Sequence, residues 1–316
     1  MRLRPVRYPL FLDIYHSTTR NRWFASEVNM SHDVIDWQQS EPAVRSLVAG
    51  ILKSFTQIEV LVSDYWADVV ASSWDVPEIV FLAREFSSQE VNHAIAYDHL
   101  EATLGLDTYE EFLSDATAQA RIGSLLSGSQ TMAAFSGAVE GVSLNVSFAL
   151  LLALARDGRF RGIQQIISWS AQDEALHSRV GILLSQLLPA SEADVIEQTF
   201  DSVVQNERAF IGNAFRDNPT VTDIATREFA LDFIYRQANR KLAELNRSAR
   251  YEEAEANPLY DHFHAILSGQ SYHDFFSVAK DGSSYTSKCR QDFASVDVGR
   301  LWGYNGECTE IQTDFK

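Results

Sequence analysis

Apolar residues recur every three to four positions along most of this chain, which is the spacing of one face of an α-helix. Strand-like alternation of apolar and polar residues is scarce, and glycine, serine and aspartate turns separate the periodic stretches. The sequence therefore predicts an all-α fold. The expected helices cover residues 42–72, 77–103, 109–126, 130–156, 160–187, 191–217, 220–248 and 257–267.

Prolines precede four of the periodic stretches, as prolines in the first turn of a helix do. They are Pro42, Pro77, Pro219 and Pro258. The segments before about residue 40 and after about residue 270 are richer in glycine, serine and aromatic residues and lack sustained helical periodicity. We therefore expect a helical domain over residues 1–280 and a flexible C-terminal tail over residues 281–316.

The stretch Met132–Ala155 is almost entirely apolar and carries a single charge, Glu140. It is long enough to span a membrane. Glu140 and Asn145 near its middle instead favour a buried bundle helix, because a carboxylate in apolar surroundings is costly unless it is paired or bound to metal.

Composition narrows the function classes. The 316 residues carry a net charge of −17, which argues against binding nucleic acid through a basic surface. The first residues lack the apolar core of a signal sequence. Only two cysteines are present, Cys289 and Cys308, so a reducing, cytoplasmic location is expected.

Two Glu-x-x-His motifs fall in predicted helices, and a lone glutamate precedes each of them. Residues three apart on a helix differ by about 60° around its axis, so the Glu and His of one motif can grip one ion. The lone glutamates precede the motifs by 31 and 34 residues, which fits one helix, a turn and part of the return helix. The candidate ligands are Glu59, Glu90 and His93 in the first set and Glu140, Glu174 and His177 in the second.

Four carboxylates and two imidazoles on four helices are the ligand set of a metal pair inside a helix bundle. One histidine per metal among carboxylates favours iron or manganese over zinc or copper. Tyr97 follows His93 by four residues and so lies on the same helix face. A phenol there suits a radical generator, with Phe148 and Leu144 as its apolar walls, although a tyrosine in a core helix can simply be a packed aromatic.

Together, Thr56–Glu59, Glu90–Tyr97, Glu140 and Asp173–His177 resemble the radical-generating small (beta) subunit of class I ribonucleotide reductase. The resemblance runs from about residue 15 to about residue 280. It implies a ferritin-like bundle, a homodimer, a dinuclear metal centre and ribonucleoside-diphosphate reductase activity. It also implies a separate large (alpha) subunit that holds the nucleotide site, which fits the absence of a phosphate-cradling loop from this sequence.

The resemblance also implies roles for single residues. The six candidate ligands correspond to the metal ligands, and Tyr97 corresponds to the radical-bearing tyrosine. Trp23 and Asp173 correspond to the radical-transfer route, in which Asp173 accepts the second ring N–H of His93. Tyr304 is the expected relay tyrosine of a tail that docks to the large subunit, with Tyr285 behind it and Trp302 nearby.

The sequence departs from the family pattern at Glu59. Members with a tyrosyl radical usually have Asp there, whereas Glu is more typical of manganese/iron members, which lack the radical tyrosine. The metal identity therefore stays open, with an iron pair expected first and manganese/iron or dimanganese pairs as alternatives. The interval from His93 to Glu140 is also shorter than in many members.

Other protein classes share parts of this pattern. A ferritin-like iron-storage protein or ferroxidase has the same bundle but does not require Trp23, Asp173 or a docking tail. An oxidase acting on a bound lipid-like molecule would share the ligands. A purely structural bundle would leave the six candidate ligands unexplained.

Overall fold

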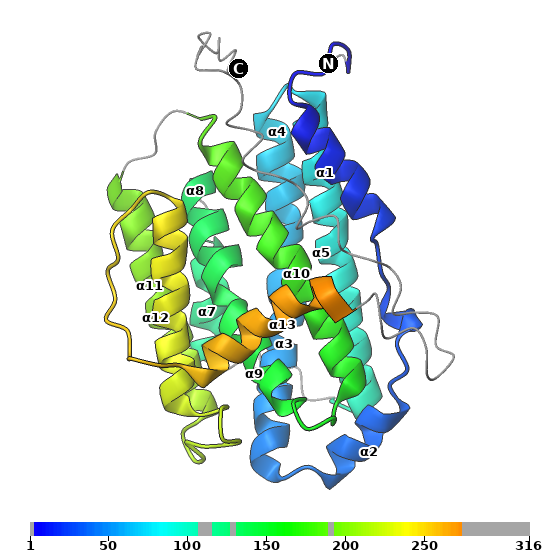
Figure 1. The fold of residues 1–316 in the computed structure, drawn as a ribbon, viewed down its shortest axis with the longest axis vertical. Coiled ribbons are helices and arrows are strands. Elements are labelled where there is room, and N and C mark those ends of the chain that lie inside the picture. Colours follow the sequence, from blue (N-terminus) through cyan, green and yellow to red (C-terminus); the bar gives the residue numbers. More distant parts are fainter. Residues whose placement is uncertain (1–2, 107–115, 127–130, 189–192, 274–316) are drawn as a thin grey trace. The chain divides into compact units, whose positions relative to one another are not determined.

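Helices make up the regular structure of the part of the chain that is described, apart from one isolated β-bridge between Thr220 and Thr226 (Figure 1). The computed structural model describes residues 3–106, 116–126, 131–188 and 193–273. The prediction of an all-α fold is confirmed.

Twelve labelled α-helices follow one another along the described residues. They are α1 (Pro9–Arg20), α2 (Ser31–Gln39), α3 (Pro42–Asp64), α4 (Ala71–Ser73), α5 (Pro77–Leu104), α7 (Ala116–Leu126), α8 (Met132–Ala134), α9 (Asn145–Leu154), α10 (Arg161–Ser185), α11 (Ala193–Ala214), α12 (Arg227–Glu244) and α13 (Pro258–His273). A 3-10 turn, η1 (Ala25–Glu27), precedes α2. Two π-helical segments, η2 (Tyr65–Val70) and η3 (Phe135–Ser143), follow α3 and α8.

The chain forms two compact units. The first contains the described parts of Met1–Arg22, Val62–Glu90 and Gly269–Lys316, and the second contains Trp23–Leu61 and Val91–Ser268. Within the first unit, Oε1 of Glu78 accepts the backbone N–H groups of Arg7 and Tyr8, each at 2.6 Å. This carboxylate ties the residues before α1 to the start of α5.

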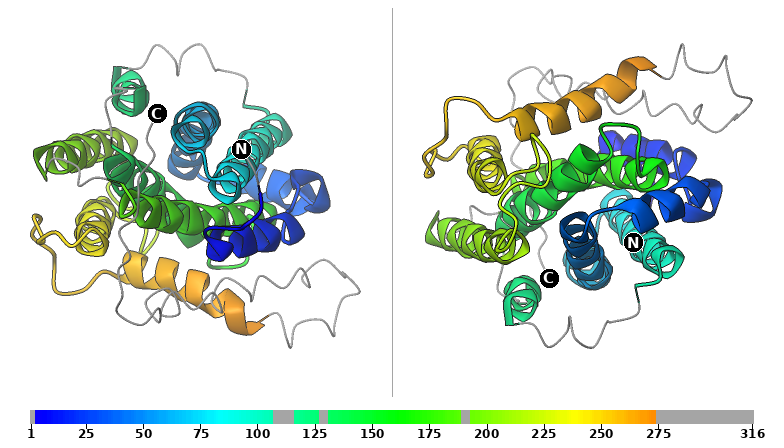
Figure 2. Two further views of the ribbon diagram at one scale, coloured as in Figure 1. Left: turned by 90° about the horizontal axis from the view of Figure 1, so that it is seen from above. Right: turned by 90° about the horizontal axis from the view of Figure 1, so that it is seen from below.

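The core of the second unit is built around the continuous η3–α9 segment, in which every residue from Phe135 to Leu154 is buried. Segment η3 packs against α10, α11 and α12. Figure 2 shows α11 and α12 beside the η3–α9 segment, seen from above and from below. Residues Met132–Leu154 are apolar enough to cross a membrane, but they are wholly buried, as expected for a core helix.

A buried ion pair crosslinks this core. Arg121 on α7 donates from Nε to Oε1 of Glu207 on α11 at 2.6 Å, and from Nη2 to Oε2 at 3.0 Å. Both side chains are about 1% exposed. Arg121 also donates to the hydroxyl of Ser54 on α3, and Ser143 donates to Oε1 of Glu207 at 2.7 Å. The pair therefore joins α3, α7, α11 and the end of η3.

Two helices that the sequence periodicity did not predict, α1 and α2, lie before residue 40. Their buried faces include polar residues. Thr18 is buried, and its hydroxyl donates a hydrogen bond to the carbonyl of Ile14. Asp33 is also buried, and its carboxylate accepts hydrogen bonds from the N–H groups of Gly162 and Ile163 at the start of α10. The spacing of apolar residues does not reveal buried polar residues such as Asp33.

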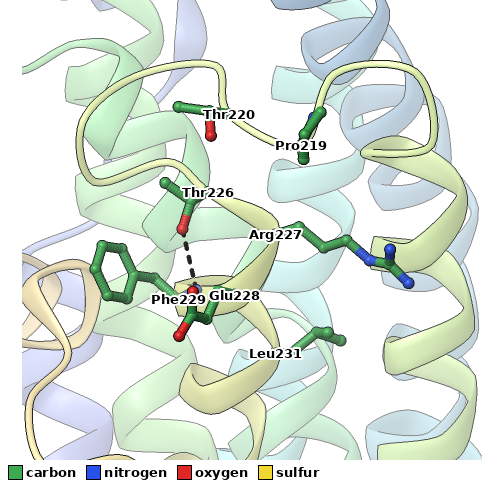
Figure 3. A pocket seen from close by; sticks show the side chains of 7 residues that line it. All are labelled: Pro219, Thr220, Thr226, Arg227, Glu228, Phe229 and Leu231. Carbon is green, nitrogen blue, oxygen red and sulfur yellow. Dashed lines mark hydrogen bonds between the residues drawn. The ribbon is translucent and has the colours of Figure 1, made fainter.

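The predicted helix over 220–248 begins too early. Helix α12 starts at Arg227, where the Thr226 hydroxyl accepts the N–H of Phe229 at 3.1 Å (Figure 3). Before it, the backbone closes a turn in which Arg227 donates to the carbonyl of Pro219 at 2.8 Å. Pro219 therefore lies in a turn, whereas Pro42, Pro77 and Pro258 do begin helices. Residues 109–115 and the expected tail over 281–316 lie outside the described residues.

The buried ion pair predicts a large, specific loss of stability. Arg121→Met should lower the free energy of unfolding by about 3–5 kcal/mol, because it leaves the Glu207 carboxylate buried without its partner. The measurement is urea denaturation of the metal-free protein. The double variant Arg121→Met/Glu207→Met should recover most of that loss.

The exposed pair between Arg156 and Asp223 supplies the control. Arg156→Met should change the free energy of unfolding by less than about 1 kcal/mol. Similar losses in Arg121→Met and Arg156→Met would contradict the assignment of Arg121 as a structural crosslink.

Candidate metal centre

Carboxylates and imidazoles from four elements of the second unit converge in its core. The candidate ligands of this unit are Glu59 on α3, His93 on α5, Glu140 on η3, and Glu174 and His177 on α10. All five side chains are 0% exposed. The structure therefore brings these five members of the two predicted sets together at one buried place.

The ligand atoms form two overlapping groups. In the first, atoms of Glu59, His93 and Glu174 lie within 4.8 Å of one another, and in the second the same holds for Glu140, Glu174 and His177. Glu174 belongs to both groups. A carboxylate has two oxygens, so Glu174 would be able to serve both groups as a ligand.

Glu90 precedes His93 by one turn on α5, and its side chain is also 0% exposed. On a continuous helix, residues three apart point to nearly the same side. The backbone of α5 therefore directs Glu90 and His93 to one face, as the Glu-x-x-His spacing predicts.

The donor chemistry fits a pair of metal ions. Clustered carboxylates repel one another, and each is costly to remove from water unless a cation offsets its charge. Carboxylate oxygens with one imidazole per group suit iron or manganese. The two groups sharing Glu174 thus support a dinuclear site.

The two ring nitrogens of His93 face different partners. Nδ1 lies 3.1 Å from Oε1 of Glu174, inside the cluster, while Nε2 lies 3.2 Å from Oδ2 of Asp173. Nδ1 is therefore the nitrogen available to an ion. A carboxylate against the other nitrogen fixes the ring orientation and tautomer.

Asp173 also connects His93 to Trp23. The indole Nε1 of Trp23 donates to the same Oδ2 atom at 2.8 Å, and its ring stacks on His93 with centroids 5.6 Å apart and an interplanar angle of 19°. Trp23 further contacts Trp169, at 5.3 Å between centroids. Our reading of the sequence missed Trp169, although its place four residues before Asp173 on α10 could have indicated it.

Tyr97 lies fully buried beside the cluster, with its ring 6.4 Å from that of His93. Its ring packs against that of Phe55, with centroids 4.9 Å apart, and the ring of Phe55 in turn packs against that of Phe148 at 4.8 Å. Leu144, the other expected wall, is also buried. Phe55 was not among the sequence candidates, although it lies one turn before Glu59 on α3.

One further feature lies apart from this cluster. An open hollow beside the start of α12 is lined by residues between Pro219 and Leu231, none of which is a candidate ligand (Figure 3). The candidate relay residue Tyr304, together with Tyr285 and Trp302, lies outside the described residues.

Comparison with known proteins agrees with this fold. The profile of the family described as "Ribonucleotide reductase, small chain" matches residues 1–258. A similar relative is the "Probable ribonucleoside-diphosphate reductase small subunit 048L" of Invertebrate iridescent virus 3, 28% identical over 310 residues, covering 86% of this chain and 81% of the relative. The small chain from Trypanosoma brucei brucei is 24% identical over 226 residues, covering 66% of each chain.

Solved structures share the fold at low sequence identity. The dimanganese(II)-NrdF of Streptococcus sanguinis aligns with a TM-score of 0.70 and 17% identity, covering 83% of this chain and 98% of that one. The Rnr4 homodimer of Saccharomyces cerevisiae aligns with a TM-score of 0.71 and 15% identity, covering 82% and 85%. The protein is thus a ferritin-like helix bundle with a carboxylate- and histidine-rich centre. It belongs to the ribonucleotide reductase small chain family.

Proposed function

We propose that this protein is the small subunit of a class I ribonucleoside-diphosphate reductase. Its metal pair generates a radical that is stored on Tyr97 and used by a separate large subunit to reduce ribonucleotides to deoxyribonucleotides. The observation that carries this proposal is the unbroken line of buried groups from the carboxylate cluster through His93 and Asp173 to Trp23.

The proposed ligands are the six residues of the two motif sets. They are Glu59, Glu90, His93, Glu140, Glu174 and His177. When bound and in an oxidised state, an iron or manganese pair would supply the oxidising power to take one electron from a nearby phenol. The donor set accommodates either metal, and the Glu59 carboxylate, one methylene longer than Asp, keeps manganese/iron and dimanganese pairs open beside an iron pair.

Tyr97 is the proposed radical site because it is close to the cluster and shielded from water. Its oxidation to a neutral radical removes one electron and the phenolic proton. Full burial, with Phe55 against the ring, keeps solvent and external reductants away from the oxidised phenol. Those surroundings favour storage of the radical over its immediate loss.

Trp23 and Asp173 are the proposed exit from the cluster. To carry an oxidising equivalent to another subunit, the protein needs aromatic side chains in contact with one another. It also needs a carboxylate that takes part in the accompanying proton transfer. Trp23 provides the ring and the N–H, and the Asp173 carboxylate accepts a hydrogen bond from that indole N–H while facing His93. A ferritin-like ferroxidase or a lipid oxidase, the alternative functions, has no use for this arrangement.

The proposed partners are a second copy of this chain and the large subunit. Apolar side chains on the outer faces of α3 and α5 are unusually exposed in the single chain: Val60 at 49%, Val91 at 47% and Ile95 at 60%. Burial of these residues against a second copy would remove apolar surface from water. Docking of residues 281–316 to the large subunit, relay through Tyr304 and a cytoplasmic location remain proposals from the family resemblance.

Metal analysis tests the centre itself. The protein loaded with iron or manganese should contain two ions per chain, and His93→Ala and His177→Ala should each lower that number, because each removes a nitrogen donor from one group. His264→Ala, which alters a histidine distant in sequence from the motifs, should keep both ions. A wild-type protein that cannot be loaded with either metal would refute the centre.

Substitution of Tyr97 tests the storage site. Tyr97→Phe should retain both ions but lose the tyrosyl signal in electron paramagnetic resonance and lose nucleotide reduction, since only the phenolic oxygen is removed. Tyr235→Phe, on the outer part of α12, should preserve both. If Tyr97→Phe still supports turnover, the oxidising equivalent resides on the metals, as in the members that carry Glu at the position of Glu59.

Substitution of Trp23 tests the exit route. Trp23→Phe keeps an aromatic ring but removes the N–H that reaches Asp173. It should preserve metal content, the tyrosyl signal and binding of the large subunit, while nucleotide reduction falls to background. Trp37→Phe on α2 is the matched control and should remain active. Full activity of Trp23→Phe would remove Trp23 from the route.

A further inference from the structure

The π-helical segment η3, which carries Glu140 at its centre, has four backbone carbonyl groups that accept hydrogen bonds from side chains. Three of the donors come from other helices, α7, α10 and α12, and the fourth comes from the start of α9. The bonds are Ser178 Oγ to Ser136 O at 2.6 Å, Asn145 Nδ2 to Glu140 O at 3.1 Å, Gln237 Nε2 to Gly141 O at 2.8 Å and Arg121 Nη2 to Ser143 O at 2.8 Å.

This support has a physical reason. A π-helix forms its hydrogen bonds between residues five apart, so its turns are wider than those of an α-helix and it is rarely stable over several turns. The width of the turn decides where a side chain on it points. Side-chain donors that hold the carbonyls on either side of Glu140 therefore also determine where its carboxylate lies.

Helix α12 holds the residue that follows Glu140 with little freedom. Besides the hydrogen bond from Gln237, the aliphatic stem of Lys241 packs on Gly141. A Cβ atom added at Gly141 would lie 2.9 Å from Cγ and Cδ of Lys241 and 2.9 Å from Oγ of Ser178. The backbone of Gly141, the stem of Lys241 and the hydroxyl of Ser178 are thus in direct contact. A movement of α12 must therefore move the π-helical turn that contains Gly141.

The choice of an amide at position 237 is informative. Gln237 is only 3% exposed, and its Oε1 atom accepts no hydrogen bond from the described residues. A buried amide oxygen without a donor lowers stability, and an apolar side chain of the same length would avoid that cost. Stability alone therefore does not account for Gln237, whereas its bond to Gly141 does.

We propose that Gln237 is a positioning residue for Glu140. By fixing the carbonyl of Gly141, it sets the width of the η3 turn and so the reach of the Glu140 carboxylate toward the group it forms with Glu174 and His177. Ser178 acts at the other end of η3, where it binds the carbonyl of Ser136 from the residue next to His177. This inference rests on the proposed metal centre, in which Glu140 is a ligand.

The test is Mn²⁺ binding to metal-free Gln237→Met. Methionine keeps the length and apolar volume of the side chain but removes the N–H donor. The affinity for one of the two ions should fall by about tenfold, the lower end of what the loss of a group that orients a ligand costs. The Mn²⁺-induced rise in Tm should shrink accordingly, while the Tm of the metal-free protein should be unchanged or slightly higher.

Asn239→Leu provides the control on the same helix. Asn239 is also buried, and its amide donates to the carbonyl of Tyr251, in the segment after α12 rather than in η3. The Asn239→Leu variant should have the same decrease in Tm with and without Mn²⁺, and its affinity for Mn²⁺ should be unchanged. An equal loss of affinity in Asn239→Leu and Gln237→Met would reduce Gln237 to general packing and overturn the proposal.

Ser178→Ala decides the question if Gln237→Met does not fold. It removes a small hydroxyl and should also weaken one Mn²⁺ site, whereas Ser170→Ala, which removes a buried hydroxyl bonded within α10, should not. If both Gln237→Met and Ser178→Ala bind Mn²⁺ with wild-type affinity, the positioning role of Gln237 is overturned, whereas the proposed metal centre is not affected. Failure of the wild-type protein to bind manganese or iron would instead refute the proposed metal centre.

Discussion

The burial of several carboxylates side by side in an apolar helical core is the constraint on which the rest of this structure depends. Glu59, Glu140 and Glu174 are fully enclosed, and no single helix could hold them together. Bound cations would offset their mutual repulsion and their loss of hydration, so metal binding to this cluster would also stabilise the bundle.

The surrounding helices are organised to hold that cluster in one geometry. Helix α10 supplies Glu174 to both groups and Asp173 to the far side of His93, so one helix orients ligands and connects them to Trp23. Because the turn of a π-helix is wider than that of an α-helix, the segment η3 places Glu140 where a regular α-helical turn would not. The ion pair between Arg121 and Glu207 then closes the end of that segment against α7 and α11.

The long helices and the candidate ligands could be predicted because each depends on local spacing. Helices α5 and α10 begin and end close to their predicted limits, and the Glu-x-x-His motifs lie on them as expected. Helix α3 begins at Pro42 as predicted but ends at Asp64, where the π-helical segment η2 interrupts the predicted helix over 42–72. The short helix α2 was missed because its buried residue, Asp33, is held by hydrogen bonds to distant backbone and not by hydrophobicity. Distant partners leave no periodic signal.

The sequence by itself determined which residue types stand one turn apart on one helix face, since 3.6 residues per turn is a property of the backbone. That is enough to pair Glu174 with His177 and to place Tyr97 one turn from His93. Only the tertiary structure decided that Glu174 is shared by both ligand groups, that Phe55 lies against Tyr97, and that Gln237 reaches the turn that carries Glu140. Those contacts join residues on different helices, and their distances depend on how the helices pack, which no local spacing specifies.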